Sequence, residues 1–235
     1  MKLVIWGSTG YIGSELIRQA LPNPAIRSIV AISSSATPIP PGLSGKNAKL
    51  RPYVCDNFES YPDNIMRELE TADACIWTND ITLIKPGKTP WDEAIKKVSC
   101  GYALTAIRTL AGFRLYRREN GPGPVRFTYI SEHFAQYDIS DDRLLTELAT
   151  LRGNVEAQLF TIADKSNGAV VSCIAKPGII VNPAADQPVP VLSVPTIELR
   201  NIAAALVDQA VNGFEKDTLS NNDLIRIGRS FLGRQ

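Results

Sequence analysis

The first fourteen residues constrain the fold more than any other stretch of the chain. Residues 3–6 form an uncharged apolar run, which predicts a fully buried strand. Glycines follow at positions 7, 10 and 13, and a helical pattern runs from residue 11 to the proline at position 22. The tight turn, the close approach of backbone to a pyrophosphate and the packing of the new helix each require a small residue. The stretch therefore predicts a dinucleotide-binding turn made of Gly7, Ser8, Thr9, Gly10, Tyr11, Ile12 and Gly13.

A phosphate in this turn would lie on the unpaired N–H groups and the positive dipole end of the new helix. A glycine-rich turn that holds no ligand is the structural alternative.

Length and composition indicate one α/β domain. The chain has 235 residues and a net charge of +1, so neither a nucleic-acid partner nor an acidic tail is indicated. No apolar run approaches a membrane span and no signal sequence is evident, which predicts a cytoplasmic protein. Four cysteines without C-x-x-C spacing and a single histidine make a metal site improbable. Residues 1–235 are expected to form one domain, with 182–235 as a small C-terminal portion on the substrate side; a homo-oligomer is left open.

Alternating strand and helix signals predict a doubly wound, mostly parallel sheet with helices on both faces. Strands are expected at 28–32, 50–55, 72–77, 125–130, 169–175 and 224–227. Helices are expected at 62–70, from 89 to about 118, from 140 to about 167, and at 196–213. The proline-containing segment 183–195 fits either a loop that covers a substrate or a plain connector.

The residues behind the second predicted strand bear on the choice between NAD and NADP. An NAD site usually has a carboxylate about 20 residues beyond the glycines, where it binds the ribose 2′-hydroxyl. No Asp or Glu occurs between Glu15 and Asp56, and the position is taken by Ser33, Ser34 and Ser35. Three hydroxyls can bind a 2′-phosphate, and the next loop adds Lys46, Lys49 and Arg51. NADP is therefore favoured over NAD, and serines that only form a turn are the alternative.

Polar residues that directly follow predicted strands are further candidates, because the ligand crevice of an open α/β sheet lies beyond the carboxyl ends of its strands. They are Asp56, Thr78, Asn79, Ser131 and His133. Asp56 suits an adenine amino group, and a turn or N-cap role is an equal alternative. Three arginines at the end of the long helix, Arg114, Arg117 and Arg118, are expected to form a solvated last turn.

Three motifs carry a family resemblance: Gly-Ser-Thr-Gly-Tyr-Ile-Gly at 7–13, Arg152-Gly-Asn-Val-Glu156, and Lys176-Pro-Gly178. Their order resembles that of an atypical short-chain dehydrogenase/reductase of the NmrA-like and Tat-interacting-protein-like branch. The resemblance covers nearly the whole chain and is weaker beyond residue 80. It implies that the first motif binds NADP or NAD, that Lys176, Pro177 and Gly178 lie beside the nicotinamide, and that Ser131 helps to hold a substrate carbonyl.

The departure from the family pattern is as informative as the match. Carbonyl reductases of the family carry Tyr-x-x-x-Lys on the helix that here contains Arg152, and the alignment places Leu148 at the tyrosine. Leucine donates no proton, and an arginine is a different hydrogen-bonding group from lysine. Arg152 is expected either to bind the ribose or to pair with Glu156 one turn away. His133, Glu132 and Tyr137 are the other candidate proton donors, with a plain loop histidine as the alternative for His133.

Three functions follow from these features. The first is an NADP-dependent oxidoreductase that reduces a C=O, C=N or C=C bond of a small organic, specialised-metabolite type of substrate. The second keeps the pocket without hydride transfer, as an isomerase or cyclase. The third is a non-catalytic regulator that senses NADP(H) and binds a protein partner.

Overall fold

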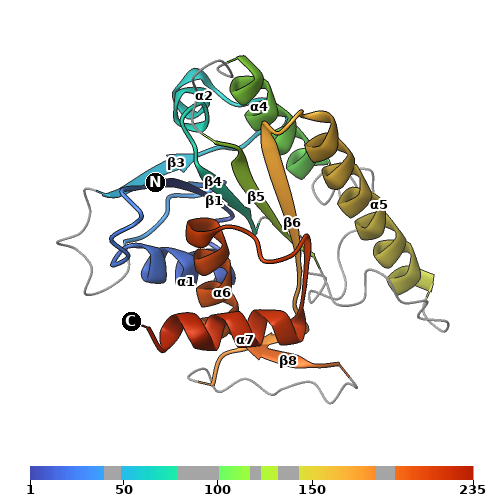
Figure 1. Cartoon of the computed structure of the whole chain (residues 1–235). Coiled ribbons are helices and arrows are strands. Elements are labelled where there is room, and N and C mark those ends of the chain that lie inside the picture. The colour runs from blue at the N-terminus through green and yellow to red at the C-terminus, as the bar shows by residue number, and fades with distance from the viewer. Residues whose placement is uncertain (40–48, 79–100, 117–122, 132–142, 184–193, 235) are drawn as a thin grey trace.

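The computed structural model of the chain describes residues 1–39, 49–78, 101–116, 123–131, 143–183 and 194–234. Its centre is a seven-stranded parallel sheet in the order β3-β2-β1-β4-β5-β6-β9, shown in Figure 1. The strands are β1 (Lys2–Trp6), β2 (Ser28–Ser33), β3 (Leu50–Val54), β4 (Ala74–Trp77), β5 (Val125–Ile130), β6 (Val170–Lys176) and β9 (Thr218–Ser220). A second, two-stranded sheet pairs β7 (Ile179–Val181) with β8 (Thr196–Glu198). The predicted doubly wound parallel sheet is confirmed.

Helices cover both faces of the large sheet (Figure 1). They are α1 (Tyr11–Ala20), α2 (Asp63–Leu69), α4 (Tyr102–Tyr116), α5 (Arg143–Lys165), α6 (Leu199–Asn212) and α7 (Asn221–Leu232). Because successive strand residues point to opposite faces, Leu3 and Ile5 of β1 pack in the core with α1, α6 and α7. Val4 and Trp6 pack in the opposite core with α2, α4 and α5. A strand buried on both sides has no polar alternation, which is why its sequence is a continuous apolar run.

The segment 224–227, predicted as a strand, lies inside α7, and the prediction was wrong for a local reason. The Ser220 hydroxyl accepts from the Asp223 N–H, and the Asp223 carboxylate accepts from the Ser220 N–H. This capping box starts a helix. Leu224, Ile227 and Phe231 then follow at helical spacing and are buried in the core.

The predicted helix 196–213 was wrong only at its start. Residues 196–198 form β8, which pairs with β7 so that Ile180 lies opposite Ile197, and α6 begins at Leu199. The three residues alternate exposed, buried, exposed, a strand pattern too short to predict on its own.

Arg114 was expected in a solvated last turn, and the structure contradicts this. Its side chain is buried, with one terminal nitrogen donating to the Ala72 carbonyl at 2.5 Å and lying 3.7 Å from Asp73. Arg114 therefore ties α4 to the loop before β4. The other two arginines of that group, at 117 and 118, lie outside the described residues.

Glu68 at the end of α2 joins three elements at the edge of the sheet. Its carboxylate bonds Lys2 at 2.5 Å, Arg51 at 2.9 Å and the Tyr53 hydroxyl at 2.9 Å. Burial alone would raise the pKa of this carboxyl, but the hydrogen bonds outweigh it and lower the pKa to about 2. Glu68 thus holds β1, β3 and α2 together as an ionised group.

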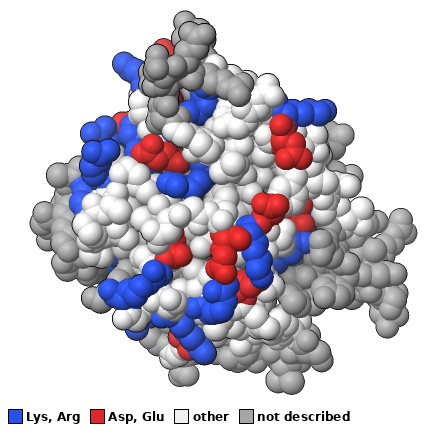
Figure 2. All heavy atoms as spheres, in the orientation of Figure 1, with Lys and Arg blue, Asp and Glu red and all other residues white. Residues whose placement is uncertain are grey.

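Charges of both signs lie side by side on the face drawn in Figure 2. Between α7 and the segment before β9, Arg226 pairs with Glu215 at 2.7 Å and Lys216 with Asp223 at 2.8 Å. Within the described part of the chain, no helix is both long and apolar enough to cross a membrane.

Candidate functional site

The glycine turn between β1 and α1 is closed by backbone contacts that exclude side chains. Gly7 has φ +76°, a left-handed conformation that favours glycine, and its N–H donates to the Ile32 carbonyl at 2.9 Å. A Cβ on Gly13 would lie 2.2 Å from the Gly7 carbonyl oxygen and 2.8 Å from the Ser8 Cα. The helix therefore packs directly against the turn, as a dinucleotide-binding turn requires.

The N-terminus of α1 is open at this turn. Gly10 is the N-cap residue, no side chain among those described caps the helix, and the first turn contains no acidic residue. Thr9, Gly10 and Tyr11 are exposed, Ile12 is half-buried, and the buried Ser8 hydroxyl bonds Thr37 at 2.7 Å. Backbone N–H groups at the positive end of the helix dipole are thus available to an anion.

The three serines behind β2 differ in their surroundings. Ser33 is buried, and its hydroxyl donates to the Ser35 carbonyl at 2.6 Å, so it closes the turn. Ser34 and Ser35 are exposed, and the Ser35 hydroxyl lies 3.4 Å from that of Thr9 in the glycine turn. The exposed residues with hydroxyls beside the glycine turn are therefore Ser34, Ser35 and Thr9.

The cations predicted beside these serines have other partners. Lys49 donates to the Leu21 and Asn23 carbonyls, at the opposite edge of the sheet, and Arg51 pairs with Glu68. Neither is placed to bind a 2′-phosphate. Lys46 lies outside the described residues.

Two further candidates follow β3 and β4. Asp56 is exposed beyond the end of β3, a place open to a ligand. The Thr78 hydroxyl donates to the Trp6 carbonyl at 2.6 Å and lies 3.2 Å from the Gly7 carbonyl oxygen. Thr78 therefore fixes the backbone at the start of the glycine turn, a role that its sequence position did not reveal. Asn79 lies outside the described residues.

Three buried polar residues meet at the carboxyl ends of β5 and β6, and we call them the carboxyl-edge triad: Ser131, Glu156 and Lys176. The Ser131 hydroxyl donates to Glu156 Oε1 at 2.5 Å, and Lys176 Nζ lies 2.6 Å from Glu156 Oε2. None of the three is more than 7% exposed. Removing one partner of such a pair would leave an uncompensated buried charge, so the triad holds β5, β6 and α5 in a fixed arrangement.

The triad determines what Ser131 offers to a ligand. A serine hydroxyl has one proton and two lone pairs. Because the proton is given to Glu156, the oxygen keeps only acceptor capacity. This differs from the donor role toward a substrate carbonyl that the family resemblance implies.

The remaining site residues predicted from the sequence lie either near the triad or outside the residues that the structure describes. Arg152 is buried on α5, one turn before Glu156, and both Glu156 oxygens have partners outside α5. Leu148 lies in the first part of α5, whose side chains are not described, and His133 lies in the undescribed segment 132–142. Sequence reasoning missed the triad because its members are 20 or more residues apart and meet only through the sheet register.

Three of the four cysteines lie in the described residues, and all three are buried free thiols: Cys55, Cys75 and Cys173. Burial raises the pKa of Cys75 well above that of an exposed thiol and raises the pKa of Cys173 to about 12. No three His, Cys, Asp or Glu side chains in the described ranges are grouped so that they could hold a metal ion.

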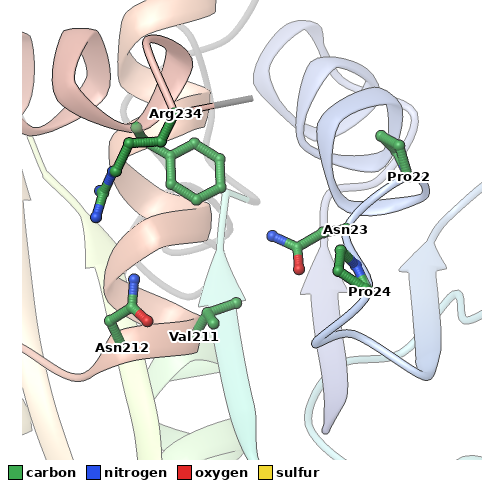
Figure 3. Close-up of a pocket in the computed structure, with 7 residues that line it drawn as sticks. Pro22, Asn23, Pro24, Val211, Asn212 and Arg234 are labelled. Atoms are coloured by element: carbon green, nitrogen blue, oxygen red, sulfur yellow. The ribbon is translucent and has the colours of Figure 1, made fainter.

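Two clefts of the described surface lie at the amino edge of the sheet, away from the glycine turn. One, of about 580 Å³, has Pro22, Asn23 and Pro24 on one side and the ends of α6 and α7 on the other (Figure 3). Its cation, Arg234, is paired with Asp208 at 2.7 Å. A second groove, of about 930 Å³, includes residues of both signs, among them Arg126 and Asp217. Ligands of open α/β sheets bind at the opposite, carboxyl edge, so we place the candidate site at the glycine turn and the triad.

The parallel sheet with helices on both faces is a Rossmann-like fold. No protein-family model and no curated protein sequence matches the chain. Solved structures match nearly its whole length, and their fold is that of short-chain dehydrogenases/reductases.

Three of these structures illustrate the similarity. A dTDP-glucose 4,6-dehydratase from Streptomyces venezuelae, with NAD bound, is 13% identical with a TM-score of 0.68, covering 99% of this chain and 81% of that one. A short-chain dehydrogenase from Burkholderia cenocepacia in complex with NADP is 12% identical with a TM-score of 0.66, covering 99% and 92%. Vestitone reductase from alfalfa is 16% identical with a TM-score of 0.65, covering 93% and 76%. At such identities the similarity establishes the shared fold.

Proposed function

We propose that the chain binds NADP(H) in the glycine turn and acts as a short-chain dehydrogenase/reductase-like oxidoreductase on a small organic substrate. The observation that carries the proposal is the turn itself. Backbone atoms of Gly7 and Ser8 occupy the space a Gly13 side chain would need, and Gly10 opens α1 without a side-chain cap among the described residues. Such a cradle fits a pyrophosphate. The NAD and NADP bound in structures of the same fold support this class of cofactor.

The preference for NADP over NAD rests on the residues behind β2. No carboxylate stands where it would bind a ribose 2′-hydroxyl and repel a 2′-phosphate. The exposed Ser34 and Ser35 hydroxyls, with Thr9 beside them, are the groups that would bind the phosphate. Since Lys49 and Arg51 have other partners, the described groups that would select NADP are hydroxyls and not cations, and we expect a modest preference.

On the nicotinamide side, Lys176, Pro177 and Gly178 would flank the cofactor, and Arg152 would bind ribose hydroxyls. Bound NADPH supplies a hydride, and the substrate must then obtain a proton elsewhere. Leu148 cannot give one, and the Ser131 proton is held by Glu156. This favours a C=N or C=C acceptor over a ketone.

The two other functions predict different behaviour of the same pocket. An isomerase or cyclase would convert its substrate with no change in nicotinamide absorbance. A regulator would turn nothing over, and NADP(H) would change its association with a protein partner.

The test uses tryptophan fluorescence. Trp6 precedes Gly7, Trp77 ends β4, and their ring centroids lie 5.3 Å apart under the proposed cofactor site. Titration with NADPH should therefore give saturable energy transfer from tryptophan to the dihydronicotinamide, at lower concentration than with NADH. Mass spectrometry of small molecules released from the purified protein would identify the substrate class. If neither dinucleotide binds, the oxidoreductase and the regulator both fall.

A further inference from the structure

We propose that Asn221 is a positioning residue that fixes the turn 176–178 beside the nicotinamide end of the cofactor. The inference goes beyond the proposed function and rests on it for the identity of the ligand. Its evidence is the set of contacts that Asn221 makes at the start of α7.

The Asn221 side chain bridges two segments that are distant in sequence. Its Oδ1 accepts from the Gly178 N–H at 2.8 Å, and its Nδ2 donates to the Thr196 carbonyl at 3.2 Å. The side chain belongs to a residue only 3% exposed. Asn221 thus joins the turn after β6 to the first residue of β8.

These two bonds are not needed to start the helix. Asn221 is the first residue of α7, and the capping box of Ser220 and Asp223 already satisfies that end. Both side-chain bonds of Asn221 go to residues outside α7. Its amide therefore serves the turn after β6 and not the helix.

A second neighbour, Pro195, lies close against the same turn. A Cβ on Gly178 would lie 1.8 Å from the Pro195 carbonyl oxygen, so only glycine fits there. The same carbonyl accepts from the Ile179 N–H at 2.9 Å. With Lys176 opposite Ser220 in the β6–β9 register, Gly178 is held between Pro195 and Asn221. Asn221 thus fixes the Gly178 N–H, and Pro195 fills the space beside the Gly178 Cα.

This arrangement predicts a loss confined to one end of the cofactor. The glycine turn follows β1 and the serines lie at the end of β2, whereas the two side-chain bonds of Asn221 go to Gly178 and Thr196. N221A leaves the Gly178 N–H without its acceptor and frees the turn. Binding of the nicotinamide half should weaken, while binding of the adenosine half should not.

The experiment compares NADPH with 2′-phospho-ADP-ribose, which lacks only the nicotinamide. For N221A we expect the NADPH Kd to rise by about tenfold or more, as for one lost hydrogen bond to a buried group, and the Kd of the fragment to stay within about twofold. N222A is the matched control, because Asn222 is the exposed neighbour on the same helix. It should change neither constant. G178A, which pushes the turn from the other side, should reproduce the N221A pattern.

Hydrogen exchange of the ligand-free protein provides a readout that does not depend on the cofactor. The Gly178 amide should exchange at least about tenfold faster in N221A than in the wild type and N222A, with β1 and β2 amides unchanged. Equal loss of NADPH and fragment, or no loss of either, would overturn the positioning role. A wild type that binds neither ligand would refute the proposed function. Unchanged Gly178 exchange in N221A would then also refute the proposal that Asn221 fixes the turn 176–178.

Discussion

Replacing Gly13 by alanine tests the candidate site at its most constrained point. The new methyl carbon would lie 2.2 Å from the Gly7 carbonyl oxygen and 2.8 Å from the Ser8 Cα, well inside the normal contact distance, and both of these are backbone atoms. Either α1 or the turn must move by about 1 Å, and overpacking of this kind costs about 1–3 kcal/mol. For a chain of this length that corresponds to a fall in Tm of roughly 2–12 °C. The displaced turn no longer presents its N–H groups in register, so we expect the NADPH Kd to rise at least about tenfold.

The chain supplies a matched control for this substitution. Gly112 is an exposed glycine inside α4, and a Cβ there meets nothing within 4 Å. G112A should therefore stabilise the helix by about 0.5–1 kcal/mol and leave cofactor binding unchanged. Affinities are measured by energy transfer to NADPH well below the Tm of each variant, with circular dichroism to confirm the folded fraction. If G13A binds NADPH as tightly as G112A, the glycine turn is not the cofactor cradle.

Three other predictions test the network around the site. For Glu68 the pKa is lowered from 4.5 to about 2, so its stabilisation of about 2–3 kcal/mol is present above pH 4.5 and is lost as the pH falls toward 2. E68Q should therefore unfold more easily at pH 7, and its free energy of unfolding, measured by denaturant titration, should fall less steeply with decreasing pH than that of the wild type. Cys75 and Cys173 should resist alkylation in the native protein and react once it is unfolded, and fast native labelling of either, followed by peptide mass spectrometry, would contradict their burial. S34A should reduce the preference for NADPH over NADH by several-fold, whereas S33A should lower Tm with little change in that ratio, and the opposite outcome would reverse the roles of the two serines.

The sheet was predictable because its sequence signals are local. Residues 125–130 were predicted and observed as the same strand, since six residues in a parallel sheet covered on both faces must be largely apolar. The glycines of the first turn were predictable for a similar reason: close packing against backbone leaves no other residue type at Gly13. Where neighbouring residues alone determine the structure, a single sequence is enough to predict it.

The errors came from two sources. For α7 the information was present, since Ser220 and Asp223 are spaced as a capping box before an apolar periodicity. The short Leu-Ile-Arg-Ile stretch at 224–227 was instead interpreted as a strand. For Arg114 and the carboxyl-edge triad the information was absent. Charged residues near a helix end are usually solvated, and only the packing of α4 beside β4 shows that Arg114 donates to a buried carbonyl. Glu156 likewise has a helical neighbour at the right spacing, but its two described partners are Ser131, directly after β5, and Lys176 at the end of β6.

The bonds within the carboxyl-edge triad limit the substrates that the proposed enzyme could reduce, because they leave few groups able to donate a proton. A general acid contributes roughly 10²- to 10⁴-fold to a carbonyl reduction, and among the site residues that the structure describes each group that could serve is occupied or unsuited. Leu148 has no proton, Ser131 directs its proton to Glu156, and Lys176 is paired with the same carboxylate. Arg152 keeps its proton at any physiological pH. An iminium acceptor needs no protonation after hydride transfer, and an enone spreads the negative charge over a conjugated system. Iminium and enone substrates should therefore exceed comparable ketones in NADPH oxidation by about 10² or more, and a ketone that matches them would show that a proton donor acts from a segment outside the triad.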